Sequence, residues 1–224
     1  MSGGTQVVIP VKRLSGALRR LGVVLSPSER ALLQEAMLRD MLTACRSASG
    51  IAGVLVVSSD ETAQRRADEA GARHLPDHDP PQGINAAVAI GQADARSRGH
   101  RALVLTADLP LVRTADVDAL AAHDTGGRGM VLVPSHTGDG TNALLIDPAD
   151  AVATLLGEDS RARHLAVARR EGIPLIEHAM PTIGLDVDTP ADLRAMLDRG
   201  APAHTLAICR SLDLATRLEA VGRT

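Results

Sequence analysis

The sequence contains no Phe, Tyr or Trp among its 224 residues. Without aromatic rings the protein cannot hold single-stranded nucleic acid by base stacking, so backbone groups, Asn, Arg or aliphatic contacts must recognise any bound base. The formal net charge of −3 also argues against general binding to nucleic acid. We therefore expect no nucleic-acid partner.

Cysteine and long apolar runs are also scarce. Cys45 and Cys209 are the only cysteines and have no metal-ligand spacing, so we expect two reduced, packed thiols. No apolar run approaches the roughly 20 residues that a membrane-spanning helix needs. The start of the chain lacks the basic and apolar pattern of a secretory signal. These absences predict a cytoplasmic protein without membrane contact.

Lysine occurs once, at Lys12, and the remaining 23 of the 24 Lys and Arg residues are Arg. Because an ammonium is compact and a guanidinium is a wide planar fork, a tight loop that places one cation against a phosphate can favour Lys. Residues 1–28 carry four basic side chains and no Asp or Glu, which suits a small polyanion. Chance is the competing explanation for a single Lys. The only two Asn residues, Asn85 and Asn142, lie in loop-like motifs and mark further candidate site loops.

Short β-branched runs alternate with longer segments of helical period, the pattern of parallel strands joined by helical crossovers. Strands are predicted at 6–10, 53–58, 102–106, 130–134, 142–146, 173–177 and 183–187. Helices are predicted at 27–47, 61–70, 84–98, 115–122, 161–171 and from Thr189 onward. Ser26 and Glu29 form a capping box at the start of the first of these helices.

The alternating pattern predicts one α/β domain with a doubly wound, mostly parallel sheet. Ligands of such sheets bind beyond the carboxyl ends of the strands. We predict that residues 1–199 form this domain and that residues 200–224 form a C-terminal extension with one amphipathic helix. In the extension Leu214, Leu218 and Val221 recur at helical spacing, which indicates packing or an oligomer contact.

Three aspartates are candidate metal ligands. Asp108 follows the strand predicted at 102–106, at its carboxyl end. Asp186 and Asp188 flank Val187, so in an extended segment their carboxylates point to the same side, about 7 Å apart, and repel each other unless a cation intervenes. Oxygen ligands without nearby His or Cys favour Mg²⁺ or Mn²⁺ over Zn²⁺. The competing interpretation is that Asp108 and Asp188 cap helices that begin nearby.

Five motifs resemble, in order, those of the phospholactate/phosphoenolpyruvate guanylyltransferases of deazaflavin coenzyme biosynthesis. They occupy residues 8–21, 107–111, 138–145, 157–164 and 185–193. The resemblance covers roughly residues 7–197. It implies a GT-A-like (Rossmann-like) nucleotidyltransferase fold. It also implies an enzyme that joins the GMP part of GTP to the phosphate of a three-carbon phosphoacid and releases pyrophosphate. Phosphoenolpyruvate is the favoured acid, with 2-phospho-L-lactate and 3-phosphoglycerate as the others.

The resemblance also implies roles for individual residues. Two Mg²⁺ ions would be held by Asp108, Asp186 and Asp188, which would be the catalytic residues together with Lys12. The phosphoacid would contact Thr141, Gly157 and Ser160. The nucleotide would contact Pro10, Val11, Lys12, Arg20 and Asn85. For Thr141 and Ser160 the competing interpretations are a hydroxyl at the entry of a strand and the N-cap of the helix at 161–171.

Two positions depart from the family pattern. Leu18 stands where the family usually has a second lysine, so Arg19 or Arg20 must take over a phosphate contact or the affinity for the triphosphate falls. Arg161 stands where a small or apolar residue is usual, and a cation beside the phosphoacid pocket could change which acid is accepted.

The alternatives left open are another nucleotidyltransferase, of molybdopterin or sugar-phosphate type, and a non-catalytic nucleotide-binding regulator. The resemblance also suggests a downstream transferase that uses the unstable product as a partner. A homodimer is left open.

Overall fold

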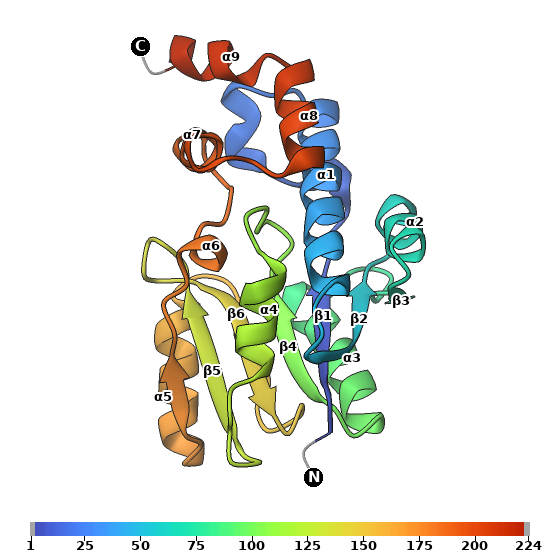
Figure 1. Cartoon of the computed structure of the whole chain (residues 1–224), viewed down its shortest axis with the longest axis vertical. Coiled ribbons are helices and arrows are strands. Elements are labelled where there is room, and N and C mark those ends of the chain that lie inside the picture. Colours follow the sequence, from blue (N-terminus) through green and yellow to red (C-terminus); the bar gives the residue numbers. More distant parts are fainter. Residues whose placement is uncertain (1–2, 222–224) are drawn as a thin grey trace.

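The computed structural model describes residues 3–221, which contain one seven-stranded sheet (Figure 1). The strands are β1 (Thr5–Pro10), β2 (Ile51–Val57), β3 (Arg73–Leu75), β4 (Arg101–Leu105), β5 (Gly129–Pro134), β6 (Thr141–Asp147) and β7 (Leu175–Glu177). Their order in the sheet is β3-β2-β1-β4-β6-β5-β7. Only β6 runs antiparallel to its neighbours, β4 and β5, whereas the other pairs are parallel. The predicted mostly parallel α/β sheet is therefore confirmed.

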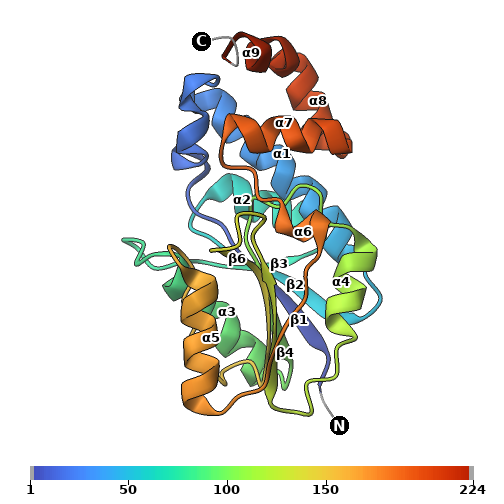
Figure 2. The same ribbon diagram turned by 90° about the vertical axis from the view of Figure 1, so that its left-hand side faces the viewer.

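Helices cover both faces of this sheet and one end of it (Figures 1 and 2). They are α1 (Pro27–Arg46), α2 (Glu61–Glu69), α3 (Ile84–Ser97), α4 (Thr114–Ala121), α5 (Ser160–Glu171), α6 (Pro181–Gly184), α7 (Pro190–Arg199), α8 (Ala203–Ser211) and α9 (Leu214–Val221), with short 3-10 turns η1 (Leu14–Gly16) and η2 (Arg19–Val23). The predicted capping box opens α1, since the Ser26 N–H donates to Glu29 and the Glu29 N–H donates to the Ser26 hydroxyl. Among the described helices, none has the length and apolar character that crossing a bilayer requires.

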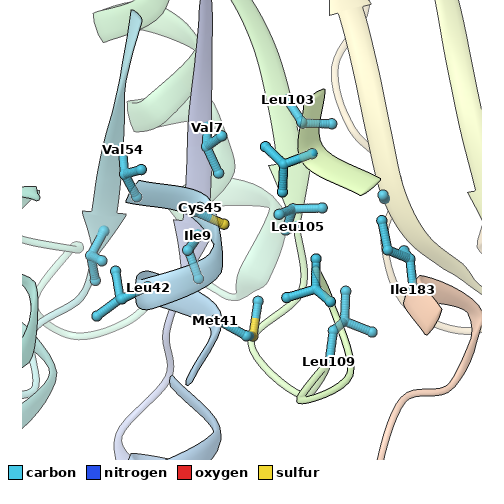
Figure 3. Packing of buried hydrophobic residues seen from close by; sticks show 14 of the residues in the cluster. Val7, Ile9, Met41, Leu42, Cys45, Val54, Leu103, Leu105, Leu109 and Ile183 are labelled. Carbon is cyan, nitrogen blue, oxygen red and sulfur yellow. The ribbon is translucent and has the colours of Figure 1, made fainter. Parts of the chain in front are cut away.

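The central strands are apolar on both faces because helices pack against each side. In β1, Val7 and Ile9 face the layer of α1, α2 and α4, and Val8 faces the layer of α3 and α5. Figure 3 shows the first of these clusters, in which Val7 and Ile9 pack with Met41 and Leu42 of α1. Two-sided burial holds the strands rigid, so the loops at their carboxyl ends start from fixed points.

A third apolar cluster lies beyond the sheet, at the upper end of α1 in Figure 1. It joins α1 and η2 to α7, α8 and α9, and includes the buried side chains of Leu214 and Leu218. The carboxylate of Asp40 on α1 accepts hydrogen bonds from the His204 and Thr205 N–H groups and from the Thr205 hydroxyl. The described part of the C-terminal extension is therefore packed into the body of the protein. Its division from a domain at 1–199 stays a prediction.

Two predicted elements differ in the structure, and one strand was not predicted. The strand expected at 183–187 is wrong: Pro181 begins the one-turn helix α6, and the extended residues that follow bond to loops rather than to a strand. The short edge strand β3 was missed because Arg73–Leu75 has no alternating apolar pattern. The extension forms two helices instead of one, because Asp213 between them has a left-handed backbone with φ of 48°.

Gly91, in the middle of α3, allows this helix to approach β1 closely. A Cβ atom added at Gly91 would lie 2.2 Å from Cγ1 of the buried Val8. Val has a stiff side chain and cannot rotate away freely. We expect Gly91→Ala to lower the free energy of unfolding by about 1–3 kcal/mol, although Ala favours helix formation. Urea unfolding followed by circular dichroism tests this, with Gly53→Ala as the control, because a Cβ there meets nothing within 4 Å. Equal stability of the two variants would contradict the close approach.

Candidate active site

The candidate site lies at the carboxyl ends of β1 and β4, which are adjacent parallel strands where the chain order reverses. Such a switch point opens a crevice in doubly wound sheets. Two adjoining hollows occupy it, with volumes of about 530 Å³ and 580 Å³. Both are lined by Lys12, Arg20, Ile84, Thr106, Asp108 and Asp188. The loops that follow β1 and β4, the start of α3 and the segment before α7 therefore meet between the hollows.

The first hollow is formed by the loop that follows β1. It is lined by Pro10, Val11, Lys12 and Arg20, four of the residues predicted to contact the nucleotide. Gln34 of α1 also lines it and donates to the Ala107 carbonyl across 2.5 Å, which holds the loop after β4. Gln34 was not predicted, because nothing in its local sequence separates it from other helix residues.

Leu18 lines the first hollow with an unusual backbone. Its φ is 51°, in the left-handed region that costs a bulky residue on the order of 1–2 kcal/mol. The side chain is buried in the third apolar cluster, which offsets this cost. At the position where the resemblance leads us to expect a second lysine, this chain therefore has an apolar anchor. The cations that line this hollow are Lys12, Arg19 and Arg20.

The second hollow contains the three residues predicted to contact the phosphoacid. Thr141 begins β6, Ser160 begins α5, and Gly157 lies in the loop before α5; all three line the hollow. Thr141 and Ser160 are buried. Residues separated in the sequence thus converge on one side of the shared carboxylates.

Asp108 is poorly neutralised in its surroundings. Its Oδ1 is buried without a hydrogen-bond partner. The pKa of Asp108 is raised to about 6, mainly by burial and in part by the nearby carboxylates of Asp186 and Asp188. Its main chain is fixed, since the Asp108 carbonyl accepts the Val187 N–H at 2.9 Å. This bond sets the extended segment containing Asp186 and Asp188 beside the end of β4.

The other two aspartates each have polar partners. Asp186 accepts a hydrogen bond from the Asn142 amide at 3.0 Å and lies 3.4 Å from His136 Nδ1. Asp188 pairs with Arg20 at 3.1 Å, an exposed contact that contributes little stability. His136 also lies 3.0 Å from Asp192 through Nε2. His136 was not predicted; its position just after the carboxyl end of β5 is the signal that could have found it.

The donor set fits a hard cation that is shared with a substrate. Within residues 3–221 no group of three or more His, Cys, Asp and Glu side chains is arranged to hold a metal ion. Mg²⁺ commonly takes only one or two protein carboxylates, and water and substrate phosphates complete its shell. The unpaired, buried oxygen of Asp108 is a group that such a cation would satisfy.

The capping interpretations of these residues are wrong. The helix after Asp108 begins at Thr114, where the Asp116 carboxylate accepts the Arg113 N–H. Thr189, not Asp188, caps α7. The N-cap position of α5 is occupied by Asp159, with Ser160 already in the first turn. The side chains of Asp108, Asp188 and Ser160 are therefore not needed to start these helices.

Asn85 and Arg161 do not occupy the positions that their suggested roles require, because neither side chain lines the two hollows. Both ends of the Asn85 amide bond to the backbone of Leu156, and the side chain is not among those lining the two hollows. Its contact with a nucleotide stays a prediction. Arg161 bonds outward to Glu177 and to the Gly138 carbonyl, so its guanidinium is not a cation in the second hollow.

Asn142 should affect activity by orienting the carboxylate of Asp186. Its buried amide nitrogen lies within 3.0 Å of Asp186 Oδ1 and of the Ile183 and Gly184 carbonyls. If Asp186 holds Mg²⁺, as the resemblance implies, Asn142→Ala should lower kcat/KM for the expected guanylyl transfer by about 10–100-fold, the usual effect of losing a partner that orients a metal ligand. Steady-state kinetics across a Mg²⁺ titration tests this, and the Mg²⁺ concentration at half-maximal rate should rise. Arg161→Ala is the control, and an unchanged Mg²⁺ response in Asn142→Ala would contradict the role.

Comparisons with known proteins show the family and the fold of this chain. Residues 5–223 match the family model described as "Guanylyl transferase CofC like". The chain is 42% identical to the phosphoenolpyruvate guanylyltransferase of Conexibacter woesei, over 93% of this chain and 96% of that one. It is 38% identical to the enzyme of the same name from Nocardia farcinica, over 96% and 95% of the two chains. In structure it resembles a nucleotidyl transferase from Methanothermobacter thermautotrophicus, with a TM-score of 0.62, 18% identity and coverage of 88% and 97%.

Proposed function

The chain belongs to the CofC-like guanylyl transferase family, and from this premise we propose that it transfers GMP from GTP to the phosphate of phosphoenolpyruvate and releases pyrophosphate. The nucleotidyltransferase fold and the relatives named phosphoenolpyruvate guanylyltransferase support the reaction class. The observation that carries the assignment to this site is the buried, unpaired oxygen of Asp108 at the junction of the two hollows.

The reaction needs charge neutralisation more than proton transfer. A phosphoacid phosphate is already anionic near neutral pH, so one of its oxygens can attack the α-phosphorus of GTP without a general base. The site must hold two anions in line and stabilise the departing pyrophosphate. In the proposed arrangement the first hollow takes GTP, the second takes the phosphoacid, and the reacting atoms meet beside Asp108.

Residues on both sides of Asp108 would share this task. Lys12 and Arg20 would hold the triphosphate and neutralise charge on the leaving pyrophosphate. Thr141, Gly157 and Ser160 would fix the phosphoacid, and buried hydroxyl and backbone groups favour one orientation of the attacking phosphate. Pro10 and Val11 would form the wall against which the nucleotide lies.

Asp108, Asp186 and Asp188 would hold Mg²⁺, and we propose two ions. Bound Mg²⁺ would neutralise the approaching phosphates and polarise the α-phosphate. Arg20 would then leave Asp188 and turn toward the triphosphate, since the exposed ion pair is weak.

The test is pyrophosphate release from GTP and Mg²⁺ with phosphoenolpyruvate, 2-phospho-L-lactate or 3-phosphoglycerate supplied separately. Mass detection of the guanylylated product identifies the acceptor. We expect the highest kcat/KM with phosphoenolpyruvate, and ATP in place of GTP is the control for the base. Protein that binds GTP but releases no pyrophosphate with any of the acids would overturn the proposal and favour the regulatory alternative.

A further inference from the structure

The side chain of His164 joins two walls of the second hollow. It lies on α5 and is completely buried. Its Nδ1 is 3.1 Å from the Thr141 hydroxyl at the start of β6, and its Nε2 is 2.9 Å from the Leu155 N–H in the loop before α5. A single imidazole thus contacts both the strand and the loop that line the proposed phosphoacid pocket.

These contacts determine where the imidazole carries its proton. A backbone N–H can only donate, so Nε2 must accept from Leu155 and carry no proton. Burial lowers the pKa of His164 to about 4, so the ring is neutral at pH 7 and its one N–H is at Nδ1. Nδ1 therefore donates to the Thr141 oxygen. The hydroxyl proton of Thr141 is then directed away from His164 and can be donated to a bound phosphate.

A second side chain, on the neighbouring helix α3 of the same layer, holds the same loop. Asn85 on α3 accepts the Leu156 N–H at 2.8 Å and donates to the Leu156 carbonyl at 3.0 Å. Leu155 and Leu156 are thus held from α5 and α3 respectively. The next residue, Gly157, has φ of 115°, and its carbonyl accepts the Ser160 N–H at 3.2 Å. Fixing the Leu155–Leu156 backbone therefore fixes the start of the turn that presents Gly157 and Ser160.

We propose that His164 and Asn85 are positioning residues of the phosphoacid pocket: His164 orients the Thr141 hydroxyl as a donor, and both residues hold the turn that carries Gly157 and Ser160. This inference rests on the proposed function, which assigns the phosphoacid to that turn and to Thr141. It gives Asn85 a role different from nucleotide contact, and His164 a role different from that of a proton-transferring base.

Two substitutions at His164 separate its contacts. In His164→Gln the longer amide can reach the place of Nε2 and accept from Leu155, but the donor to Thr141 is lost. In His164→Asn the shorter amide can reach the place of Nδ1 and donate to Thr141, but the Leu155 N–H is left unpaired. Val167→Ala, further along α5 in a partly buried apolar contact, is the matched control for a loss of packing alone.

The measurement is KM for phosphoenolpyruvate and for GTP in the wild-type protein and each variant. We expect His164→Gln, which loses one hydrogen bond, and Asn85→Ala, which loses two, each to raise KM for phosphoenolpyruvate by at least about tenfold, with KM for GTP changed less than twofold. Val167→Ala should leave both values unchanged. In a Thr141→Val background, His164→Gln should hardly change KM for phosphoenolpyruvate any further, because the hydroxyl that His164 orients is gone. His164→Asn should raise this KM as much as it does when Thr141 is present, because it acts through Leu155.

The ring nitrogen shifts of ¹⁵N-labelled protein give a readout that does not depend on turnover. We expect a neutral His164 ring protonated at Nδ1, assigned by its loss in His164→Gln. This inference alone would be overturned if the wild-type protein is active and both His164→Gln and Asn85→Ala have an unchanged KM for phosphoenolpyruvate. A His164 ring protonated at Nε2 would also overturn it. Absence of wild-type turnover with every phosphoacid would overturn the proposed function, and this inference with it.

Discussion

Asp108→Ala should lower kcat/KM for guanylyl transfer by at least about 10³-fold, equivalent to about 4 kcal/mol of transition-state stabilisation. Asp108 stands where both hollows meet and has a buried oxygen without a partner. In the proposed mechanism it is one of three carboxylates that hold Mg²⁺, and its loss would remove a ligand at the junction of the two hollows. Pyrophosphate release with saturating Mg²⁺ measures the loss.

The same substitution should leave the protein equally stable or make it more stable. A carboxylate that has one buried, unpaired oxygen and lies near two others, with its pKa raised to about 6, costs free energy in the folded state. We expect the free energy of unfolding without Mg²⁺ to be unchanged or higher by about 1 kcal/mol. Circular dichroism is the method, since the chain has no aromatic fluorophore.

Asp118→Ala is the matched control for an aspartate that serves the fold. Its carboxylate accepts the Gly50 N–H at 2.8 Å, away from both hollows. This variant should lose about 1 kcal/mol of stability and retain its activity. Normal turnover of Asp108→Ala, or a loss of activity that merely follows unfolding, would remove Asp108 from the mechanism.

Lys12→Ala should lower kcat/KM for GTP about 100-fold, mainly through a higher KM for GTP. Lys12 lines both hollows, and Leu18 supplies no second ammonium in the same loop. Charged hydrogen bonds contribute about 1.5–3 kcal/mol each, which corresponds to roughly this loss. Initial rates over a range of GTP concentrations, at saturating phosphoenolpyruvate, test the expectation.

Two further variants test whether the shape and the position of the cation matter as well as its charge. Lys12→Arg keeps the charge but places a wide planar fork in a tight loop, so we expect an intermediate loss of about tenfold. Arg13→Ala, at the neighbouring exposed position outside both hollows, should change KM for GTP less than threefold. An unchanged KM in Lys12→Ala would show that GTP is held by other cations.

Several features of this protein follow from local sequence. The capping box at Ser26 and the β-branched runs predicted α1 and the central strands closely, because capping and alternation are short-range effects. The alternation around Val187 predicted an extended segment with Asp186 and Asp188 on one side, and in the structure Val187 is buried whereas both aspartates are partly exposed. It could not indicate that this segment bonds to the loop after β4 instead of joining the sheet, because apolar alternation measures burial and not hydrogen-bond partners.

The site itself depended on contacts between residues that are distant in sequence. Local pattern identified Lys12 and Asp108, which lie just after strands, whereas Thr141 was identified through the family resemblance. Local pattern could not assign His164 to Thr141 or Asn85 to Leu156, partners that are 23 and 71 residues apart. A residue type states which hydrogen bonds are available, but only the packing of α3 and α5 against the sheet decides which partners are within reach.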